Sequence, residues 1–215
     1  MKVNNKLKEY IENTILKEYD KNDKGHALDH IEYVIKRSFA FASTIPNINY
    51  DMVYTIASYH DIAHHIDAKN HEKLSAKILF EDKNLRNFFT EDEIKTMAYA
   101  VEDHRASNNN EPRNIYGKIV SSADRNTEIE VYLRRTYEYI KEHNENDTLE
   151  QMIEDSKQHM KNKFGKSGYA TEKMYFEDKE YEKFLKDVDE LVQDEELFRK
   201  MFIKVNGVCI KQKKL

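Results

Sequence analysis

The chain has 215 residues, and its 35 lysines and arginines are nearly balanced by 40 aspartates and glutamates, for a net charge of −5. No basic stripe of the kind that binds nucleic acids stands out, and no apolar run approaches the ~18 residues that span a membrane. The single cysteine, Cys209, excludes an internal disulfide and any cysteine-rich zinc site. Because a lone cysteine fits a reducing compartment and the N-terminus has no apolar leader, we expect a cytoplasmic protein.

Residues that favour turns are scarce, since the chain has only 5 glycines and 2 prolines. The stretches between them are rich in Lys, Glu, Leu, Ile and Tyr, a composition typical of helical proteins. A chain of this length suits one globular domain. We therefore predict an all-α fold, a single-domain helical bundle with additional C-terminal helices.

Apolar residues recur every three or four positions along the first half of the chain, which is the period of a helix with one buried face. Thr90 and Glu93 form a capping box that predicts a helix start at Thr90. The other predicted helices of this half span about 3–20, 27–44, 50–65, 70–84 and 113–127.

The second half is also predicted to be helical. Residues 128–143 continue the pattern, and Asp147 is the expected cap of a helix that runs to about Met160. A last long helix spans about 178–202. Asn206-Gly207 then gives a hairpin signal, although a frayed tail is equally favoured.

Three segments are expected from this organisation. They are an N-terminal helix over 1–20, a core over 21–130, and a C-terminal helical extension over 131–215 that packs on the core.

The segment YHDIAHH, from Tyr59 to His65, concentrates three histidines and an aspartate. On the predicted helix 50–65, His60 and His64 prolong the apolar stripe, and Asp61 lies about 100° round from His60. His60 and Asp61 can therefore converge on one ion. His64 is the next residue out, and His65 is the expected bystander.

The same pattern recurs on four other predicted helices, where His30, His71, His104 and Asp124 each stand three or four residues from an apolar position. If the apolar stripes share a core, their polar ends meet in one pocket. A lone inward histidine is more often an ordinary core or surface residue, so the prediction rests on the set. Imidazoles and carboxylates without a thiolate suit Mn²⁺, Fe²⁺, Co²⁺, Ni²⁺ or Zn²⁺, with Mg²⁺ less favoured.

The order His, His-Asp, Asp resembles the signature of the HD superfamily of metal-dependent phosphohydrolases. Five segments carry the resemblance, over roughly residues 20–130: GHALDHIEYV, ASYHDIAHH, NHEKLSA, AVEDHR and IVSSADR. The sequence departs from the family pattern at Ala27 and Ser122, where relatives often have aspartates. The resemblance implies an all-α bundle and hydrolysis of a phosphomonoester or phosphodiester by a metal-activated water.

The resemblance also implies roles for individual residues. The metal ligands would be His30, His60, Asp61 and Asp124. His71 and His104 stand at positions that bind a second metal or the substrate phosphate in some branches of the family.

Further residues are candidates for the chemistry itself. Asp61 could orient or deprotonate the attacking water, and His64 stands where some nucleotidase branches have a proton-handling Glu. Histidines exchange protons near neutral pH, so His64 and His104 are candidate proton carriers. Lys118 and Arg125 are candidate phosphate contacts, although a solvated or ion-paired charge is the more common role for such residues.

The favoured function is therefore metal-dependent hydrolysis of a small phosphorylated substrate, expected to be a nucleotide. The acidic net charge disfavours long nucleic acids, and no membrane partner is expected. Two alternatives stay open, a non-catalytic metal- or nucleotide-binding HD sensor module and a helical interaction protein with incidental histidines. The C-terminal half, rich in Tyr and Phe, either covers the pocket or forms the face of a homodimer.

Overall fold

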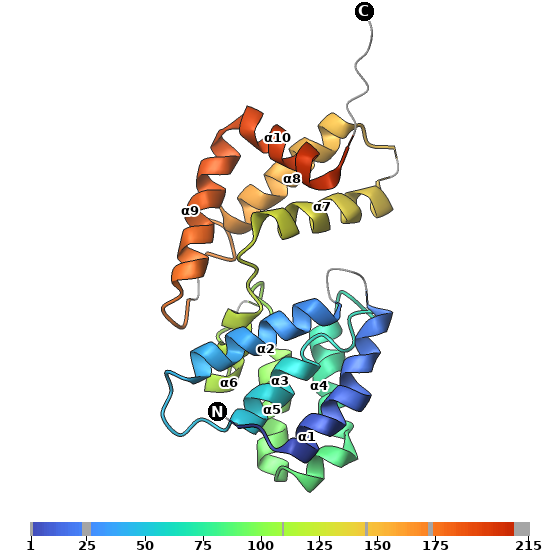
Figure 1. The fold of residues 1–215 in the computed structure, drawn as a ribbon, viewed down its shortest axis with the longest axis vertical. Helices are drawn as coiled ribbons and strands as arrows, with labels where there is room; N and C mark the ends of the chain where they lie inside the picture. Colours follow the sequence, from blue (N-terminus) through green and yellow to red (C-terminus); the bar gives the residue numbers. More distant parts are fainter. Residues whose placement is uncertain (1, 23–26, 109, 145, 172–173, 209–215) are drawn as a thin grey trace, which may run out of the picture. The chain divides into compact units, whose positions relative to one another are not determined.

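The computed structural model describes residues 2–22, 27–108, 110–144, 146–171 and 174–208, and these are helices joined by turns and loops (Figure 1). The all-α prediction is confirmed. The chain divides into two compact units, Met1–Arg125 and Asn126–Leu215, and the C-terminal helices form a cluster of their own. Among the described residues, no helix combines the length and apolar character needed to cross a bilayer.

The first unit is built from six α-helices and several shorter helical segments within the described residues. The α-helices are α1 (Asn5–Tyr10), α2 (Leu28–Ala42), α3 (Tyr50–Tyr59), α4 (His71–Glu81), α5 (Glu91–Glu102) and α6 (Ile115–Ala123). A π-helical turn, Ile11–Ile15, and a 3-10 segment, Leu16–Lys21, extend α1, and a second 3-10 segment, Lys83–Asn87, follows α4.

The N-terminal segment, residues 2–22, is helical over most of the predicted range, but its hydrogen-bond pattern changes twice along its length. Leu7, Ile11, Ile15 and Tyr19 recur every four residues, and each is at most 5% exposed. This apolar stripe anchors the segment to the rest of the first unit, because each buried side chain of this size contributes roughly 1.5–3 kcal/mol.

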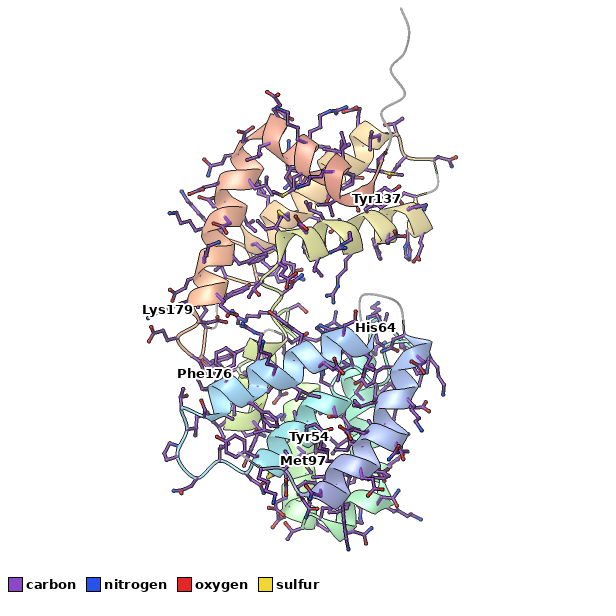
Figure 2. All side chains as sticks on the ribbon, in the orientation of Figure 1. Tyr54, His64, Met97, Tyr137, Phe176 and Lys179 are labelled. Atoms are coloured by element: carbon purple, nitrogen blue, oxygen red, sulfur yellow. The ribbon has the colours of Figure 1, made fainter. Side chains whose placement is uncertain are left out.

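The core of the first unit is formed by apolar faces that the sequence period predicts. Ile31 and Val34 on α2 are fully buried, as are Ile94 and Val101 on α5. Figure 2 labels Met97 in this core, where its side chain is also fully buried. The capping box at the start of α5 is confirmed, since the Thr90 side chain accepts from the Glu93 backbone and the Glu93 side chain accepts in return.

Helix α3 ends earlier than predicted. It was expected to continue to residue 65, but it stops at Tyr59, and the backbone then proceeds through three-residue turns. The Ile62 amide donates to the Tyr59 carbonyl (3.2 Å), and the His64 amide donates to the Asp61 carbonyl (3.0 Å). His60 is therefore the end of the helix, and Asp61 and His64 lie on a turn.

Helix α6 approaches α5 closely at Gly117. A Cβ atom at this position would lie 2.8 Å from Cβ of Pro112 and 3.5 Å from Cα of Ala100, so a larger residue would push the two segments apart. Asn114 caps α6 by accepting a hydrogen bond from the Gly117 amide (2.9 Å). The observed helix is shorter than the predicted 113–127 and ends at Asp124.

The second unit contains α7 (Ile129–His143), α8 (Leu149–Phe164), α9 (Lys179–Gln193) and α10 (Glu195–Asn206). It has its own core, in which Leu133, Met160, Val188 and Phe198 are fully buried. Tyr137, labelled in Figure 2, packs edge-on against Phe202 at a centroid distance of 5.8 Å.

Three details of the second unit differ from the prediction. The cap of α8 is Thr148 and not Asp147, because the Thr148 side chain accepts from the Gln151 backbone. The predicted helix 178–202 is interrupted at Asp194, whose side chain accepts from the Leu197 amide and starts α10. The hairpin prediction at Asn206-Gly207 is wrong for its first strand, because the chain is helical up to Asn206. Gly207 ends α10 in a left-handed conformation (φ +60°). Residues 209–215 lie outside the described residues.

Candidate metal centre

The candidate ligands lie at the ends of helices that converge on one region of the first unit. His30 is in the first turn of α2, and His60 is the residue at which α3 ends. His71 begins α4, His104 follows the end of α5, and Asp124 ends α6. The structure brings these polar ends together in two groups, and within each group all ligand atoms lie within 4.8 Å of one another.

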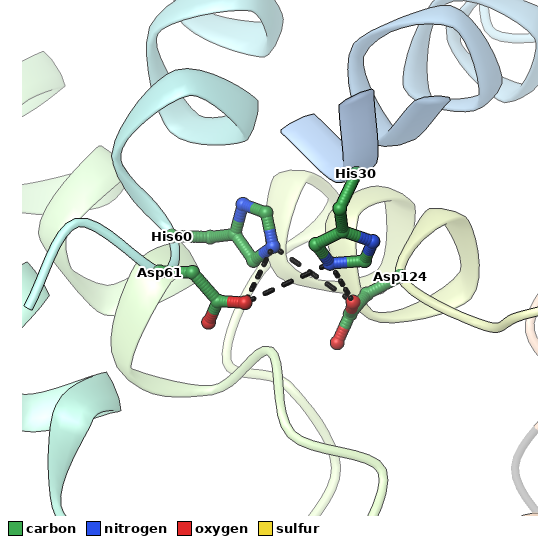
Figure 3. Close-up of side chains that lie close together, drawn as sticks. All are labelled: His30, His60, Asp61 and Asp124. Atoms are coloured by element: carbon green, nitrogen blue, oxygen red, sulfur yellow. Dashed lines mark ion pairs between the residues drawn. The ribbon is translucent and has the colours of Figure 1, made fainter. Parts of the chain in front are cut away.

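The first group consists of His30, His60, Asp61 and Asp124 (Figure 3). Nε2 of His30 lies 3.0 Å from Oδ1 of Asp124 and 3.7 Å from Oδ2 of Asp61. Nε2 of His60 lies 3.4 Å from Oδ2 of Asp61 and 3.8 Å from Oδ1 of Asp124. Two ligands that each bind an ion at about 2.1 Å are separated by about 3.0–3.4 Å when they subtend about 90–109°. The observed spacings are close to those of a coordination sphere.

The second group consists of Asp61, His71 and His104. Oδ1 of Asp61 lies 3.0 Å from Nε2 of His71 and 3.3 Å from Nε2 of His104, and the two nitrogens are 3.3 Å apart. Asp61 thus presents one oxygen to each group. The Asp61 carboxylate could therefore contribute a ligand to each of two ion sites.

Three of the candidate ligand histidines each make the same kind of local hydrogen bond. Nδ1 of His60 donates to the Ala57 carbonyl (2.9 Å), Nδ1 of His71 to Ala68 (2.9 Å), and Nδ1 of His104 to Val101 (2.6 Å). A carbonyl only accepts, so Nδ1 carries the proton and Nε2 keeps its lone pair in the neutral ring. Each carbonyl lies three residues before its histidine, and all three imidazoles therefore present Nε2 to the centre.

The centre is buried, and its donor set fits a divalent transition metal. His60, Asp61 and His104 are 0%, 2% and 1% exposed. Nε2 of His60 is buried without a hydrogen bond, which would be unfavourable by about 1–3 kcal/mol unless another partner, such as a metal ion, were present. Nitrogen and carboxylate donors without sulfur suit Mn²⁺, Fe²⁺, Co²⁺, Ni²⁺ or Zn²⁺ better than Mg²⁺.

Proton affinities in the centre are coupled. Burial disfavours the charged form of His60, but Asp61 and Asp124 outweigh burial and raise the pKa of His60 well above its ordinary value. The pKa of His30 is raised in the same way, with Asp124 as the main contact opposing burial. Burial also disfavours ionised Asp61, yet the surrounding imidazoles hold the pKa of this carboxyl well below its usual range. Ion binding at these residues must therefore displace protons.

The other residues of YHDIAHH separate as the sequence suggested. The His64 ring is half-buried and packs against the His71 ring at a centroid distance of 5.0 Å, beside the second group. His65 is exposed, and its Nδ1 donates to Oδ1 of Asn22 (2.9 Å). His65 is not a member of either ligand group.

The two candidate phosphate contacts lie in different surroundings. Lys118 extends to Glu111, with 3.1 Å between Nζ and Oε2. Arg125 is 6% exposed and directly follows the ligand Asp124, and its carbonyl accepts a hydrogen bond from the Tyr33 hydroxyl (3.0 Å). Contact of either side chain with phosphate stays a prediction.

Three further histidines complete the set. His143 and His159 are exposed on α7 and α8, and neither belongs to a candidate ligand group. His26 lies outside the described residues.

One ion pair beside the centre was missed from the sequence. Glu72 and Arg105 each directly follow a ligand histidine, and Nη1 of Arg105 lies 3.2 Å from Oε2 of Glu72. Arg105 also donates to the Lys69 carbonyl (2.8 Å), so it ties the segment after His104 to the start of α4. The neighbouring dipeptides His-Glu and His-Arg were the available signal, but pairing between them depends on how α4 and α5 pack.

A cavity of about 560 Å³ is lined by residues that neighbour the second group in sequence. Its lining includes Glu72, Asp103 and Arg105, which are sequence neighbours of the ligands His71 and His104. The described residues that line it are polar or charged, and the cations among them are Lys73, Arg105 and Arg113. Its size lies within the range of about 300–1,000 Å³ that is common for small-molecule sites.

Comparison with known families identifies the domain that carries these residues. Residues 27–127 match the model of the HD domain family, and all the candidate ligands of both groups fall within this range. The chain carries an HD domain. The resemblance inferred from the motifs is thereby confirmed, and HD domains belong to a superfamily of metal-dependent phosphohydrolases. No curated protein and no solved structure matches the chain.

The HD match does not cover the whole chain. The N-terminal segment precedes it, and nearly all of the second unit follows it. The match therefore covers the candidate ligands, whereas the roles of these two flanking parts have to be argued from their own contacts.

Proposed function

We propose that the protein is a metal-dependent phosphohydrolase that cleaves a phosphomonoester or phosphodiester of a small nucleotide. The observation that carries this proposal is the position of Asp61, whose two oxygens face separate groups of histidine Nε2 atoms in a buried HD centre. This arrangement offers one ion site and room for a second, and it is the donor chemistry that hydrolytic metal centres use.

Residues of the first group would hold the principal ion, and His71 and His104 would hold a second ion or the substrate phosphate. A divalent ion supplies two effects when bound: it acidifies a water ligand and offsets negative charge on phosphoryl oxygens. Asp61 contributes negative charge to both groups and orients the attacking water. Asp124 neutralises part of the charge of the first group only.

Proton transfer is assigned to histidines at the edge of the centre. His64 is half-buried, packs against His71 and belongs to neither ligand group, and an imidazole exchanges protons near neutral pH, so it is the proposed donor of a proton to the leaving alcohol. His104 has Nδ1 bound to the Val101 carbonyl, which leaves only Nε2 for a ligand or a substrate oxygen. We therefore assign the proton to His64 and binding to His104.

The choice of a small substrate is supported by charge and by size. With a net charge of −5, the chain lacks the excess of cations that binding a long nucleic acid requires. The polar cavity of about 560 Å³ could receive the part of a nucleotide that does not react, and its lining offers both cations and carboxylates as partners for polar groups of such a ligand. Arg125 is the cation nearest in sequence to Asp124 and is proposed as a phosphate contact.

The test combines metal content with turnover. Purified protein would be stripped with chelator, reloaded with Mn²⁺, Co²⁺, Ni²⁺, Zn²⁺ or Mg²⁺, and assayed on p-nitrophenyl phosphate, bis-p-nitrophenyl phosphate, nucleoside monophosphates and cyclic nucleotides. His60→Ala should lose both metal and hydrolysis. His143→Ala is the matched control, because it removes an exposed histidine from the second unit.

Each outcome separates the alternatives. Metal binding without turnover on any phosphate ester would reject the enzyme in favour of a metal-binding sensor module. A His60→Ala variant that keeps its full metal content would reject the metal centre itself.

A further inference from the structure

Helix α3 ends because side chains of the N-terminal segment occupy the carbonyls that would extend it. In a continuing α-helix the Ser58 carbonyl would accept from the Ile62 amide, four residues on. The Ile62 amide instead donates to Tyr59, and the Ser58 carbonyl accepts from the hydroxyl of Tyr19 (3.0 Å). Tyr19 is 1% exposed, so this contact is shielded from water.

The second replaced bond involves Asn22. An α-helix would join the His65 amide to the Asp61 carbonyl. Asn22 stands between these two groups: its Nδ2 donates to the Asp61 carbonyl (3.1 Å), and its Oδ1 accepts from the His65 amide (3.0 Å). One side-chain amide thus satisfies both ends of a helical hydrogen bond while holding the ends apart. Insertion of a polar group into the helical ladder is a recognised cause of such breaks.

This insertion sets the turn that carries the centre. Asp61 is the residue shared by both ligand groups, and its own carbonyl is the atom that Asn22 holds. If the helix continued, His64 would follow His60 on the same face one turn later. In the observed turn the His64 ring instead packs against His71. The direction of the Asp61 carboxylate and the place of His64 both depend on the turn.

We propose that Asn22 is a positioning residue of the metal centre and acts through the turn from Asp61 to His65. Tyr19 assists by ending α3 at the preceding turn. The N-terminal segment, which precedes the HD match, would in this way help to position the metal centre in addition to packing on the first unit. The inference deepens the proposed function, but it concerns metal geometry and can be tested without a substrate.

The experiment is a Co²⁺ titration of the full-length, metal-stripped protein, followed by visible absorbance. Asn22→Ala should bind Co²⁺ about 10–100-fold more weakly, the range found when partners that orient metal ligands are removed, and its ligand-field bands should change. Asn87→Ala is the matched control, since this exposed amide donates to the Asn84 carbonyl (3.0 Å) in the same unit. His65→Ala should also resemble the wild type, because the backbone amide of residue 65 keeps its bond to Asn22.

A role confined to stability gives a different result. In that case Asn22→Ala would lower the midpoint of urea unfolding but leave the affinity and spectrum of Co²⁺ unchanged, and the proposal would be overturned. Hydrogen exchange adds a readout that needs no metal, because the amide of residue 65 should lose protection in Asn22→Ala. If Asn22→Ala does not fold, Asn22→Asp keeps the acceptor and removes the donor, and the same titration applies.

Failure of this inference is distinct from failure of the proposed function. A wild-type protein that binds Co²⁺ but hydrolyses no ester rejects the enzyme, while the comparison of the Asn22 variants still decides the role of Asn22. An active wild type with an unaltered Asn22→Ala centre rejects only the positioning role. A wild type that binds no Co²⁺ overturns both.

Discussion

Replacing Asp61 by asparagine should remove metal from both ligand groups at once. The substitution keeps the size of the side chain and removes the charge that lies 3.0–3.7 Å from the Nε2 atoms of His30, His60, His71 and His104. The second group then retains only its two histidines, and the first retains two histidines and Asp124. Among the residues that the structure describes, no other candidate ligand belongs to both groups.

The expected size of the effect follows from binding linkage. Loss of a residue that merely orients a ligand weakens metal binding by about 10–100-fold, so loss of the shared carboxylate should exceed about 100-fold. At a free metal concentration of about 1,000 times the wild-type Kd, one bound ion stabilises the native state by ~4 kcal/mol. In Asp61→Asn this stabilisation should fall below ~1.4 kcal/mol at the same concentration.

The assay is thermal unfolding with and without Co²⁺ or Mn²⁺, together with metal content after gel filtration. The wild type should gain roughly 8–16 °C in Tm on loading, and Asp61→Asn should gain less than about 6 °C. Asp92→Asn, an exposed carboxylate in the first turn of α5, is the control and should behave as the wild type. Retention of half or more of the metal by Asp61→Asn would refute the assignment of Asp61 as the shared ligand.

Three further predictions concern the separate parts of the molecule. His71→Ala should retain the ion of the first group and lose at most one equivalent of metal, while hydrolysis drops by at least about 100-fold; loss of all metal would show that the groups are not separable. In metal-free protein, the raised pKa values of His30 and His60 stabilise the folded state. This stabilisation is complete below the unfolded histidine pKa of ~6.5 and is lost as pH rises through the folded pKa values. The lowered pKa values of Asp61 and Asp124 also stabilise the folded state, and that contribution is lost as pH falls below ~4. In chelator, the free energy of unfolding measured with urea should therefore be highest at about pH 4–6.5 and should fall toward pH 8. For metal-loaded protein it should rise over the same pH interval, because ligation releases protons. Equal pH dependence of the two free energies would contradict this prediction. Phe198→Ala should destabilise the second unit by about 3–5 kcal/mol without changing Co²⁺ affinity, and a matching loss of affinity would show that the centre depends on that core.

Much of the fold could be predicted from the sequence because helix period and burial agree in most segments. The apolar stripes of α2, α5 and α6 were predicted from spacing alone, and their polar ends do meet. Local patterns also identified the capping box at Thr90. At Asp194 the same period was misleading, since the break between α9 and α10 is made by a single capping side chain that leaves the hydrophobic pattern unchanged.

The centre was harder to predict where distant residues decide local structure. The end of α3 depends on Tyr19 and Asn22, which lie 39 positions before the carbonyls they contact, and no pattern within YHDIAHH reveals them. The Glu72–Arg105 pair likewise requires the packing of α4 against α5. The candidate ligands were predicted from helical spacing and the resemblance to the HD superfamily, whereas the shared position of Asp61 between two groups emerged only from the geometry.

The carbonyl contacts of His60, His71 and His104 have a consequence for how the centre assembles. Each hydrogen bond spans only three residues, so the tautomer and the orientation of each ring are set by its own turn of the chain. Contacts of such short range form early and add little to the time a chain needs to fold. Ligand direction is thus encoded turn by turn, and only the meeting of the turns depends on the tertiary fold. A chain refolded in chelator should regain these three ring orientations in the absence of metal. Metal would then bind after the chain has folded and would not be needed to start folding.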